Sequence, residues 1–416
     1  MRFNFAASVR IKRKSCRLMA AVITTLLVVT AHAQDLQIAT PEEVGMSSAG
    51  LARATARLQQ HVDDGDSKVV YFESLGLMDI EKQQPMVDSA LFRQYSMTRQ
   101  ITSVAVLKLA EDGLLDVNDP VSQYLPQFAD QRVFLNPADP SLDQTRERVG
   151  DMTIAHLLTH TGGLSSRSTP IYRANNVRER SITLPEMVDR AARVPLFADP
   201  GTEFRYGISA TILGRVVEVA SGMAFEDYLQ AKLFQPLGMT DTVFWADPSR
   251  LDRLATVYRP TNGRLAPYEI EDVPFTVRPA LIEGGVGLLS TPIDFLRFSQ
   301  MILNRGGFDG RRVLEPATVD LIFANAVPDR ALPIGSGGYW LGSGWSLGGF
   351  NVVLDNSSYS FPVGNGTIWW DGSAGTRYFI DPAQNLIILI MAQVSPAGAN
   401  GFRENFSQLV DDAIVH

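Results

Sequence analysis

The chain has 416 residues, long enough for two or three domains, with 45% hydrophobic and 20% charged residues, an ordinary globular mixture. This composition excludes a disordered, collagen-like or disulfide-scaffold protein. A net charge of −8 disfavours a nucleic-acid partner, because binding a phosphate backbone needs a basic face. With one cysteine and five histidines, the chain has no cysteine-rich zinc site, and we expect no bound metal.

The first 33 residues have the pattern of a secretory signal peptide. Six of the 37 basic residues lie in the first 17 positions, an apolar run from Met19 to Val29 follows, and Ala31-His32-Ala33 is an A-x-A cleavage site. An N-terminal membrane anchor is the alternative, but the run is shorter than the ~20 apolar residues that a span needs. We expect cleavage after Ala33, a periplasmic or secreted location, and no stable membrane span afterwards.

The predicted elements alternate between strand-rich ends and a mainly helical middle. In chain order we expect a helix over 47–62, a strand over 68–75, a helix from 96 to about 113, helices over 210–219 and 225–233, strands over 351–354, 367–370, 376–380 and 386–391, and a helix from 402 to 413. Strands at both ends predict one α/β sheet domain, split by a helical insertion. The Gly-rich run 335–349 matches no phosphate-binding motif and is expected to be a loop at the sheet edge.

Ser96 is the most informative candidate nucleophile. A serine at a helix N-terminus gains from the helix dipole, which stabilises a developing oxyanion, and Arg99 lies one turn along on the same face. In S-x-x-K enzymes that position is a lysine, which takes the serine proton. By itself the pattern is more typical of a plain helix N-cap, because a capping serine followed by a basic residue is common. No G-x-S-x-G elbow is present, which disfavours an α/β-hydrolase.

Several segments in the same order share their pattern with one known superfamily. They are Phe92–Val106 around Ser96, Asp119–Pro126, Thr153–Leu164 (TIAHLLTHTGGL), Pro200–Tyr206 (PGTEFRY), Pro236–Met239, Gly284–Leu288, Gly375–Thr376 and Asp381–Pro382. Over roughly residues 40–415 the chain thus resembles the β-lactamase-related serine hydrolases, the superfamily of class C β-lactamases, penicillin-binding carboxypeptidases and family VIII carboxylesterases. This resemblance implies a β-lactamase/transpeptidase-like antiparallel sheet flanked by helices.

The resemblance assigns catalytic roles. It implies that Ser96 is acylated, that Tyr206 acts as its base or as partner of the lysine, and that the backbone N–H groups of Ser96 and Ser373 form the oxyanion hole. Its third motif falls on Trp370-Asp371-Gly372 at the substrate-binding side, and Ile208 takes the place of the polar residue in Y-x-N. Trp370 replaces a carboxylate-binding cation, which favours esters over penicillin-like substrates.

Several departures bear on activity. Arg99 cannot accept a proton at neutral pH, so base catalysis falls to Tyr206 or a water, and losing such an acceptor costs roughly 10²–10⁴ in rate. Asp371 places a carboxylate beside the expected oxyanion site unless strand alternation turns it away. Between 62 and 68 the chain lacks room for the first strand that the family has before its nucleophile helix.

These observations predict an exported, esterase-like serine hydrolase that acts on a small-molecule ester or amide and needs no cofactor. The mature domain would span 34–416, with sheet parts at about 40–115 and 285–416 and the insertion at about 116–284. A catalytically impaired relative that binds a ligand or peptidoglycan is one alternative. A β-lactamase or D-alanyl carboxypeptidase is another.

Overall fold

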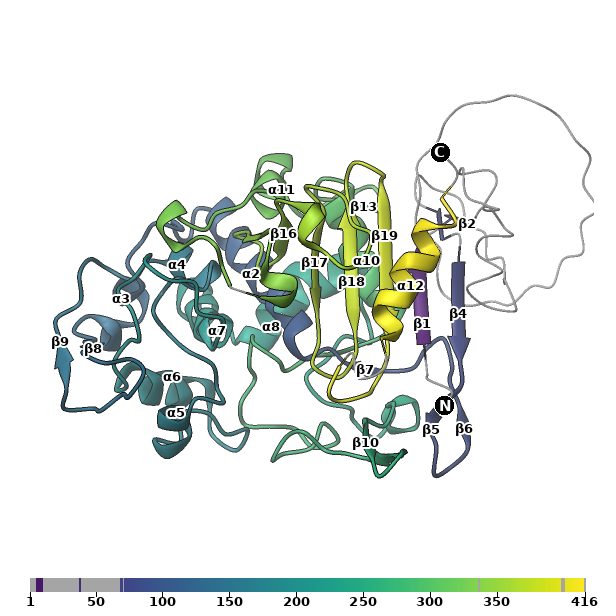
Figure 1. The fold of residues 1–416 in the computed structure, drawn as a ribbon, viewed down its shortest axis with the longest axis horizontal. Helices are drawn as coiled ribbons and strands as arrows, with labels where there is room; N and C mark the ends of the chain where they lie inside the picture. The colour runs from purple at the N-terminus through teal and green to yellow at the C-terminus, as the bar shows by residue number, and fades with distance from the viewer. Residues whose placement is uncertain are drawn as a thin grey trace, which may run out of the picture.

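The largest sheet among the described residues has seven antiparallel strands and lies in one half of the molecule, on the right in Figure 1. The structure is a computed structural model and describes residues 5–9, 37–38, 68–69, 71–335, 337–397 and 401–414. The strand order is β15 (Ser343–Trp345), β16 (Asn351–Val353), β17 (Ile368–Asp371), β18 (Arg377–Asp381), β19 (Leu386–Met391), β1 (Phe5–Val9) and β4 (Tyr71–Leu75).

Both faces of the sheet are covered by helices, and the strand sequences show why. Along β18, Phe379 points to one apolar cluster while its neighbours Tyr378 and Ile380 point to the other. The side-chain period of two thus places apolar groups on both faces, so each face needs a cover. Helix α12 (Phe402–Asp411) packs on the face of Phe379, and α10 (Pro292–Leu303) and α2 (Thr98–Glu111) share a core with the opposite face.

Strand β1 occupies the position where the sequence predicts a missing strand. Residues 5–9 pair with β19 on one side and β4 on the other, with Ala6 opposite Met391 and Ala7 opposite Glu73. Residues 5–9 therefore fill the expected gap in the sheet. They lie much earlier in the chain than 62–68, where the first strand was expected. The same residues belong to the predicted leader, so cleavage after Ala33 would remove this strand.

The helices between β7 (Phe92–Arg93) and β12 (Leu289–Ser290) hold much of the remaining chain. Figure 1 places α3, α5 and α6 at the end of the molecule farthest from α12. The α-helices between β7 and β12 are α2, α3 (Val121–Tyr124), α4 (Ile154–Leu158), α5 (Pro170–Ala174), α6 (Leu184–Ala192), α7 (Ser209–Ser221), α8 (Phe225–Leu229) and α9 (Gln235–Leu237). Helix α11 (Pro316–Phe323) follows α10 later in the chain.

Short two-stranded pieces complete the fold. They are β2 (Gln37–Ile38) with β3 (Lys68–Val69), β5 (Leu77–Asp79) with β6 (Gln84–Pro85), β7 with β12, β8 (Val133–Phe134) with β9 (Thr145–Arg146), β10 (Tyr258–Thr261) with β11 (Arg264–Pro267), and β13 (Gly307–Phe308) with β14 (Arg311–Arg312). The pair β7–β12 matters most here, because β7 leads directly into the candidate nucleophile.

The α/β class and most predicted elements are confirmed. Strand β19 has the predicted bounds, β16 to β18 lie within a residue of them, and Gly113, at φ +71°, follows α2 as expected. The run 335–349 was predicted as a loop only, but it contributes the edge strand β15. The helix predicted over 47–62 lies outside the described residues.

Among the helices that the structure describes, none combines the length and apolarity needed to span a bilayer.

Candidate active site

Ser96 lies in a single 3₁₀ turn, Tyr95–Met97, that leads into α2. The sequence places it at the helix N-terminus, and the structure places it just before the first α-helical turn. Tyr95 is fully buried and has φ +44°, which a tyrosine rarely adopts. Backbone strain of this kind persists only where surrounding packing enforces it, and it often marks a functional site.

Arg99 reaches across to the segment that carries Tyr206. Its Nη1 donates a 2.6 Å hydrogen bond to the carbonyl oxygen of Gly207, and its guanidinium carbon lies 4.3 Å from the centre of the Tyr206 ring. Arg99 is only 7% exposed. Its Nε has no hydrogen-bond partner among the described residues. The guanidinium thus lies close enough for its charge to act on the Tyr206 ring.

Glycines allow these segments to approach closely. A Cβ on Gly207 would lie 2.1 Å from the carbonyl oxygen of Ser165, and one on Gly285 would lie 2.6 Å from the hydroxyl of Thr211 in α7. At Gly207 the facing atom is backbone and cannot move aside, so only a residue without a side chain fits there, while a side chain at Gly285 would displace the Thr211 hydroxyl. The Gly284–Leu288 segment thus lies against α7, which begins three residues after Tyr206.

An aromatic cluster surrounds Tyr206. The indole Nε1 of Trp370 donates a 3.0 Å hydrogen bond to the Tyr206 hydroxyl, and the rings of Trp345 and Trp340 lie 5.8 and 6.0 Å away. The His160 ring is closer still, at 4.8 Å. Trp370 thus contacts the site through Tyr206 and supplies a hydrogen-bond donor at this position.

Burial dominates the ionisation of the two titratable rings. Burial raises the pKa of Tyr206, while the charge of Arg99 and hydrogen bonds with Ser96 and Trp370 partly offset that rise. Burial, with Arg99 nearby, holds the pKa of His160 well below its usual value. At neutral pH His160 is therefore uncharged and Tyr206 is protonated.

The third-motif segment turns its residues in different directions. A Cβ on Gly372 would lie 2.5 Å from the carbonyl oxygen of Gln94, so the turn after β17 packs directly against the segment that precedes Ser96. The Asp371 carboxylate accepts 3.0 Å hydrogen bonds from Arg377 and from Arg403 of α12. It is therefore held on the α12 face of the sheet, and the structure does not bring it to the candidate site.

A cavity of about 160 Å³ brings several predicted site residues together. Its lining includes five of them: Ser96, Arg99, Tyr206, Ile208 and Ser373. Trp370 and Gly372 contact residues of this region, as described above, without lining the cavity. The sequence interpretation missed the other lining residues, which are Ser166, Arg167, Arg178, Gly207, Thr211, Glu283, Gly285 and Val286.

A cluster of ion pairs forms one side of this cavity. Arg178 contacts both Glu271, at 2.6 Å, and Glu283, while Arg167 donates a 2.8 Å hydrogen bond to Glu271. Burial alone would raise the pKa of Glu271, but the two arginines hold it at about 2. Within this cluster, the sequence signals that could have indicated the residues are the TIAHLLTHTGGL motif, which Arg167 follows, and the Gly284–Leu288 motif, which Glu283 precedes.

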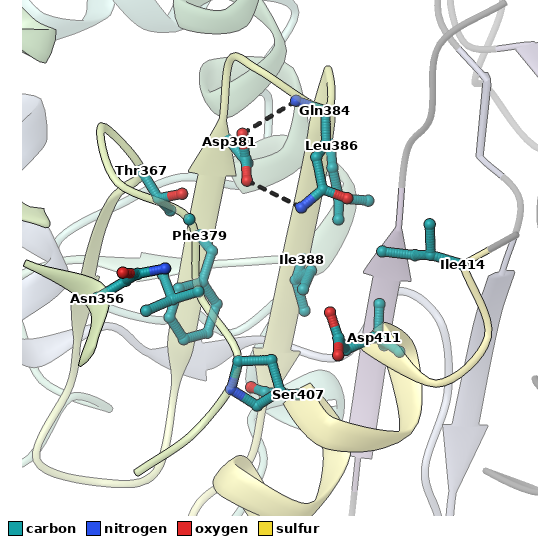
Figure 2. A pocket seen from close by; sticks show the side chains of 14 residues that line it. Asn356, Thr367, Phe379, Asp381, Gln384, Leu386, Ile388, Ser407, Asp411 and Ile414 are labelled. Atoms are coloured by element: carbon teal, nitrogen blue, oxygen red, sulfur yellow. Dashed lines mark hydrogen bonds between the residues drawn. The ribbon is translucent and has the colours of Figure 1, made fainter. Parts of the chain in front are cut away.

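A larger cavity of about 310 Å³ lies elsewhere, between α12 and the sheet (Figure 2). Figure 2 shows Phe379 and Ile388 lining it from the strands, with Asp411 and Ile414 on the α12 side. The Asp381 side chain accepts hydrogen bonds from Gln384 in the hairpin turn beside it. None of the predicted site residues lines this second cavity.

Comparison with known proteins gives the same fold. The chain superimposes with a TM-score of 0.70 on EstCE1, a hydrolase with promiscuous acyltransferase activity, at 25% identity over 84% of this chain and 91% of that one. Esterase EstB of Burkholderia gladioli is 30% identical over 80% of this chain and 85% of its own length. An uncharacterized protein of Mycobacterium tuberculosis is 32% identical over 79% and 84%, respectively.

The fold and these relatives define a class of hydrolases and acyltransferases built on the β-lactamase/transpeptidase scaffold. The Beta-lactamase family model matches residues 62–410, which include every candidate site residue described above. This chain therefore belongs to the Beta-lactamase family.

Proposed function

We propose that the protein is an esterase-like serine hydrolase that forms an acyl-enzyme on Ser96. The observation that carries the proposal is that Ser96, Arg99 and Tyr206 line one cavity, with the Arg99 guanidinium carbon 4.3 Å from the centre of the Tyr206 ring. A nucleophile beside a titratable group that a third residue orients is the arrangement that nucleophilic catalysis requires. The esterase relatives support a small-molecule ester or amide as substrate.

In the proposed reaction the Tyr206 phenolate takes the proton of Ser96 as Oγ attacks the ester carbonyl. The backbone N–H groups of Ser96 and Ser373 stabilise the oxyanion that forms. Collapse of this intermediate breaks the bond to the alcohol, which leaves with the proton from Tyr206. A water molecule then attacks the acyl-enzyme and gives one proton to Tyr206, which passes it to the Ser96 Oγ as the acid is released.

Arg99 has an electrostatic role in this scheme. It cannot accept the serine proton, but its charge favours the phenolate form of Tyr206 that can. Because burial keeps the pKa of Tyr206 above its usual value, only a small fraction is phenolate at neutral pH. We expect slow turnover near pH 7 that rises as the pH increases.

Two further parts of the proposal concern the whole chain. Residues 1–33 would be an export leader cleaved after Ala33, which places the mature protein in the periplasm or outside the cell. Residues 34–416 would be one catalytic domain, with a sheet part at about 40–115 and 285–416 and a helical insertion at about 116–284.

Labelling and turnover test this function together. The protein is incubated with a fluorescent phosphonate that labels active-site serines and, separately, with 4-nitrophenyl butyrate at pH 7 to 10. We expect label on Ser96 and turnover that rises with pH, both lost in Ser96→Ala. Neither label nor turnover at any pH would overturn the proposal.

A catalytically impaired binding protein is the second candidate, and Arg99 at the lysine position favours it. Such a protein would bind ligands, peptidoglycan fragments among them, in an intact cavity without hydrolysing esters. A β-lactamase or D-alanyl carboxypeptidase is disfavoured because Trp370 replaces a carboxylate-binding cation. Covalent labelling by a fluorescent penicillin would reverse that judgement.

A further inference from the structure

The cavity beside Ser96 is rich in positive charge although the chain as a whole carries a net charge of −8. Three arginines line it, Arg99, Arg167 and Arg178, but only one acidic residue, Glu283. A second glutamate, Glu271, lies behind them and pairs with Arg167 and Arg178. Three guanidinium groups thus face two carboxylates, which leaves one positive charge uncompensated within the cluster.

The arginines differ in how far their hydrogen-bonding capacity is used. Arg178 contacts both carboxylates, and its side chain is 10% exposed. Arg99 donates to Gly207 and lies over Tyr206. Arg167 donates one hydrogen bond, from Nη1 to Glu271, and its side chain is 29% exposed. A guanidinium has five N–H donors, so Arg167 retains capacity for a ligand in the cavity.

A fourth arginine adds to the positive potential. Arg180 is 1% exposed, and its guanidinium carbon lies 4.0 Å from the centre of the Phe275 ring. Its Nε, Nη1 and Nη2 find no hydrogen-bond partner among the described residues, and Asp272 contacts only its backbone N–H. Buried charge without full compensation is costly, and an anion entering the cavity would relieve that cost.

We propose that this cavity binds esters that carry a carboxylate, and that Arg167 is the residue that binds this group. The inference rests on the proposed function and specifies its substrate class. A planar guanidinium matches a carboxylate with two parallel hydrogen bonds, and its partly exposed position lets a substrate reach it. Trp370 stands where related enzymes have a carboxylate-binding cation. In this chain Arg167, on the loop between α4 and α5, would supply that positive charge instead.

Substrate pairs that differ only in this charge test the inference. One pair is the 4-nitrophenyl monoester of adipic acid and its methyl ester, with the charge on the acyl side. The other is 4-acetoxybenzoate and its methyl ester, with the charge on the leaving group. For each pair, the ratio of kcat/KM for the charged ester to that for the neutral one is measured, with the uncatalysed rate subtracted.

We expect the ratio to favour the charged ester in at least one pair and to fall roughly 10- to 100-fold in Arg167→Gln, as for the loss of hydrogen bonds to a charged group. Arg173→Gln is the matched control, because it removes the same charge from an exposed position in α5 that does not line the cavity. The control should leave the ratio unchanged. A ratio near one in both pairs, or one that Arg167→Gln does not alter, would overturn the inference while esterase activity stands.

Binding to the Ser96→Ala protein separates this inference from a failure of the proposed function. If no ester is hydrolysed, calorimetry compares the four probes as ligands of Ser96→Ala. Tighter binding of a charged probe than of its methyl ester, lost in the double variant with Arg167→Gln, supports the carboxylate site. Equal binding of charged and neutral probes contradicts it.

Discussion

The guanidinium of Arg99 donates a 2.6 Å hydrogen bond to the backbone carbonyl of Gly207, the residue directly after Tyr206. This bond holds the arginine charge over the Tyr206 ring. Arg99 occupies the position of the S-x-x-K lysine and contacts the tyrosine segment, but it cannot exchange a proton with Ser96. The site has therefore kept the positive charge and lost a proton acceptor.

Replacing Arg99 with lysine should increase esterase activity. A buried lysine can lose its proton, so Arg99→Lys would restore the missing base, and we expect kcat for 4-nitrophenyl butyrate to rise about 100-fold or more at pH 7. The pH dependence should also become flatter between pH 7 and 10. Arg99→Gln controls for loss of charge and should lower the rate. An unchanged kcat in Arg99→Lys, with Ser96 still labelled, would show that proton acceptance is not limiting.

The hydrogen bond from Trp370 should control the pKa of Tyr206, the proposed base. This bond lowers the pKa of Tyr206, so Trp370→Phe, which keeps an aromatic ring without the N–H donor, raises it. We expect kcat/KM to fall by roughly 3- to 10-fold and its rise with pH to move to higher pH. Trp369→Phe, on the opposite face of the sheet, is the control for loss of an indole. Superimposable pH profiles for Trp370→Phe and the parent would contradict this role.

Gly207 should tolerate no side chain. Its Cβ would lie 2.1 Å from the Ser165 carbonyl oxygen, a backbone atom that cannot rotate away, so Gly207→Ala must displace the Tyr206 segment. We expect a loss of about 1–3 kcal/mol in the free energy of unfolding, measured in urea, and loss of phosphonate labelling. Gly337→Ala is the control, since no atom lies within 4 Å of its Cβ position. Full labelling of Gly207→Ala would mean that the segment adapts.

Ionisation of Glu271 should make the free energy of unfolding depend on pH in the acidic range. Its pKa is 4.5 in the unfolded chain and about 2 in the folded one, where Arg167 and Arg178 compensate it. A lowered carboxyl pKa contributes stability above pH 4.5, and this contribution is lost as the pH falls from 4.5 towards 2. It amounts to roughly 3 kcal/mol.

Urea unfolding between pH 3 and 6 measures this contribution. Glu271→Gln should be less stable than the parent at pH 6, and the difference should shrink as the pH falls. The exposed Glu203, which pairs with Arg205, provides the control Glu203→Gln. If Glu271→Gln lost the same free energy at pH 3 as at pH 6, the pairing would not control ionisation of Glu271.

Removal of the predicted leader should weaken the sheet around β1. Without residues 5–9, the facing edges of β19 and β4 lose their partner, and unpaired backbone in a sheet is costly. We expect faster amide hydrogen exchange in 71–75 and 386–391 of the chain that begins at residue 34 than in the full chain. Ala7→Pro in the full chain removes one N–H donor of β1 and should have a similar, smaller effect. Equal exchange in both chains would show that residues 5–9 do not protect these strands.

Local pattern was sufficient where a segment alone determines its structure. Strand β19 matches its predicted bounds because six consecutive apolar residues between a turn and a loop are buried on both faces. The strand alternation considered for Asp371 accounts for its position, since Asp371 shares the α12 face with Trp369 while Trp370 contacts Tyr206. The ordered family segments were enough to indicate the family.

The sequence by itself determined the α/β class, the family and the residues proposed for acylation, because these depend on local periodicity and on motifs of a few adjacent residues. Only the tertiary structure decided that Arg99 bonds to Gly207, that residues 5–9 fill the sheet, and that Arg167 and Arg178 meet Glu271 beside Ser96. The partners in these contacts are about 60 to 390 positions apart in the chain. Such contacts follow from how helices and strands pack, and no local pattern encodes that packing.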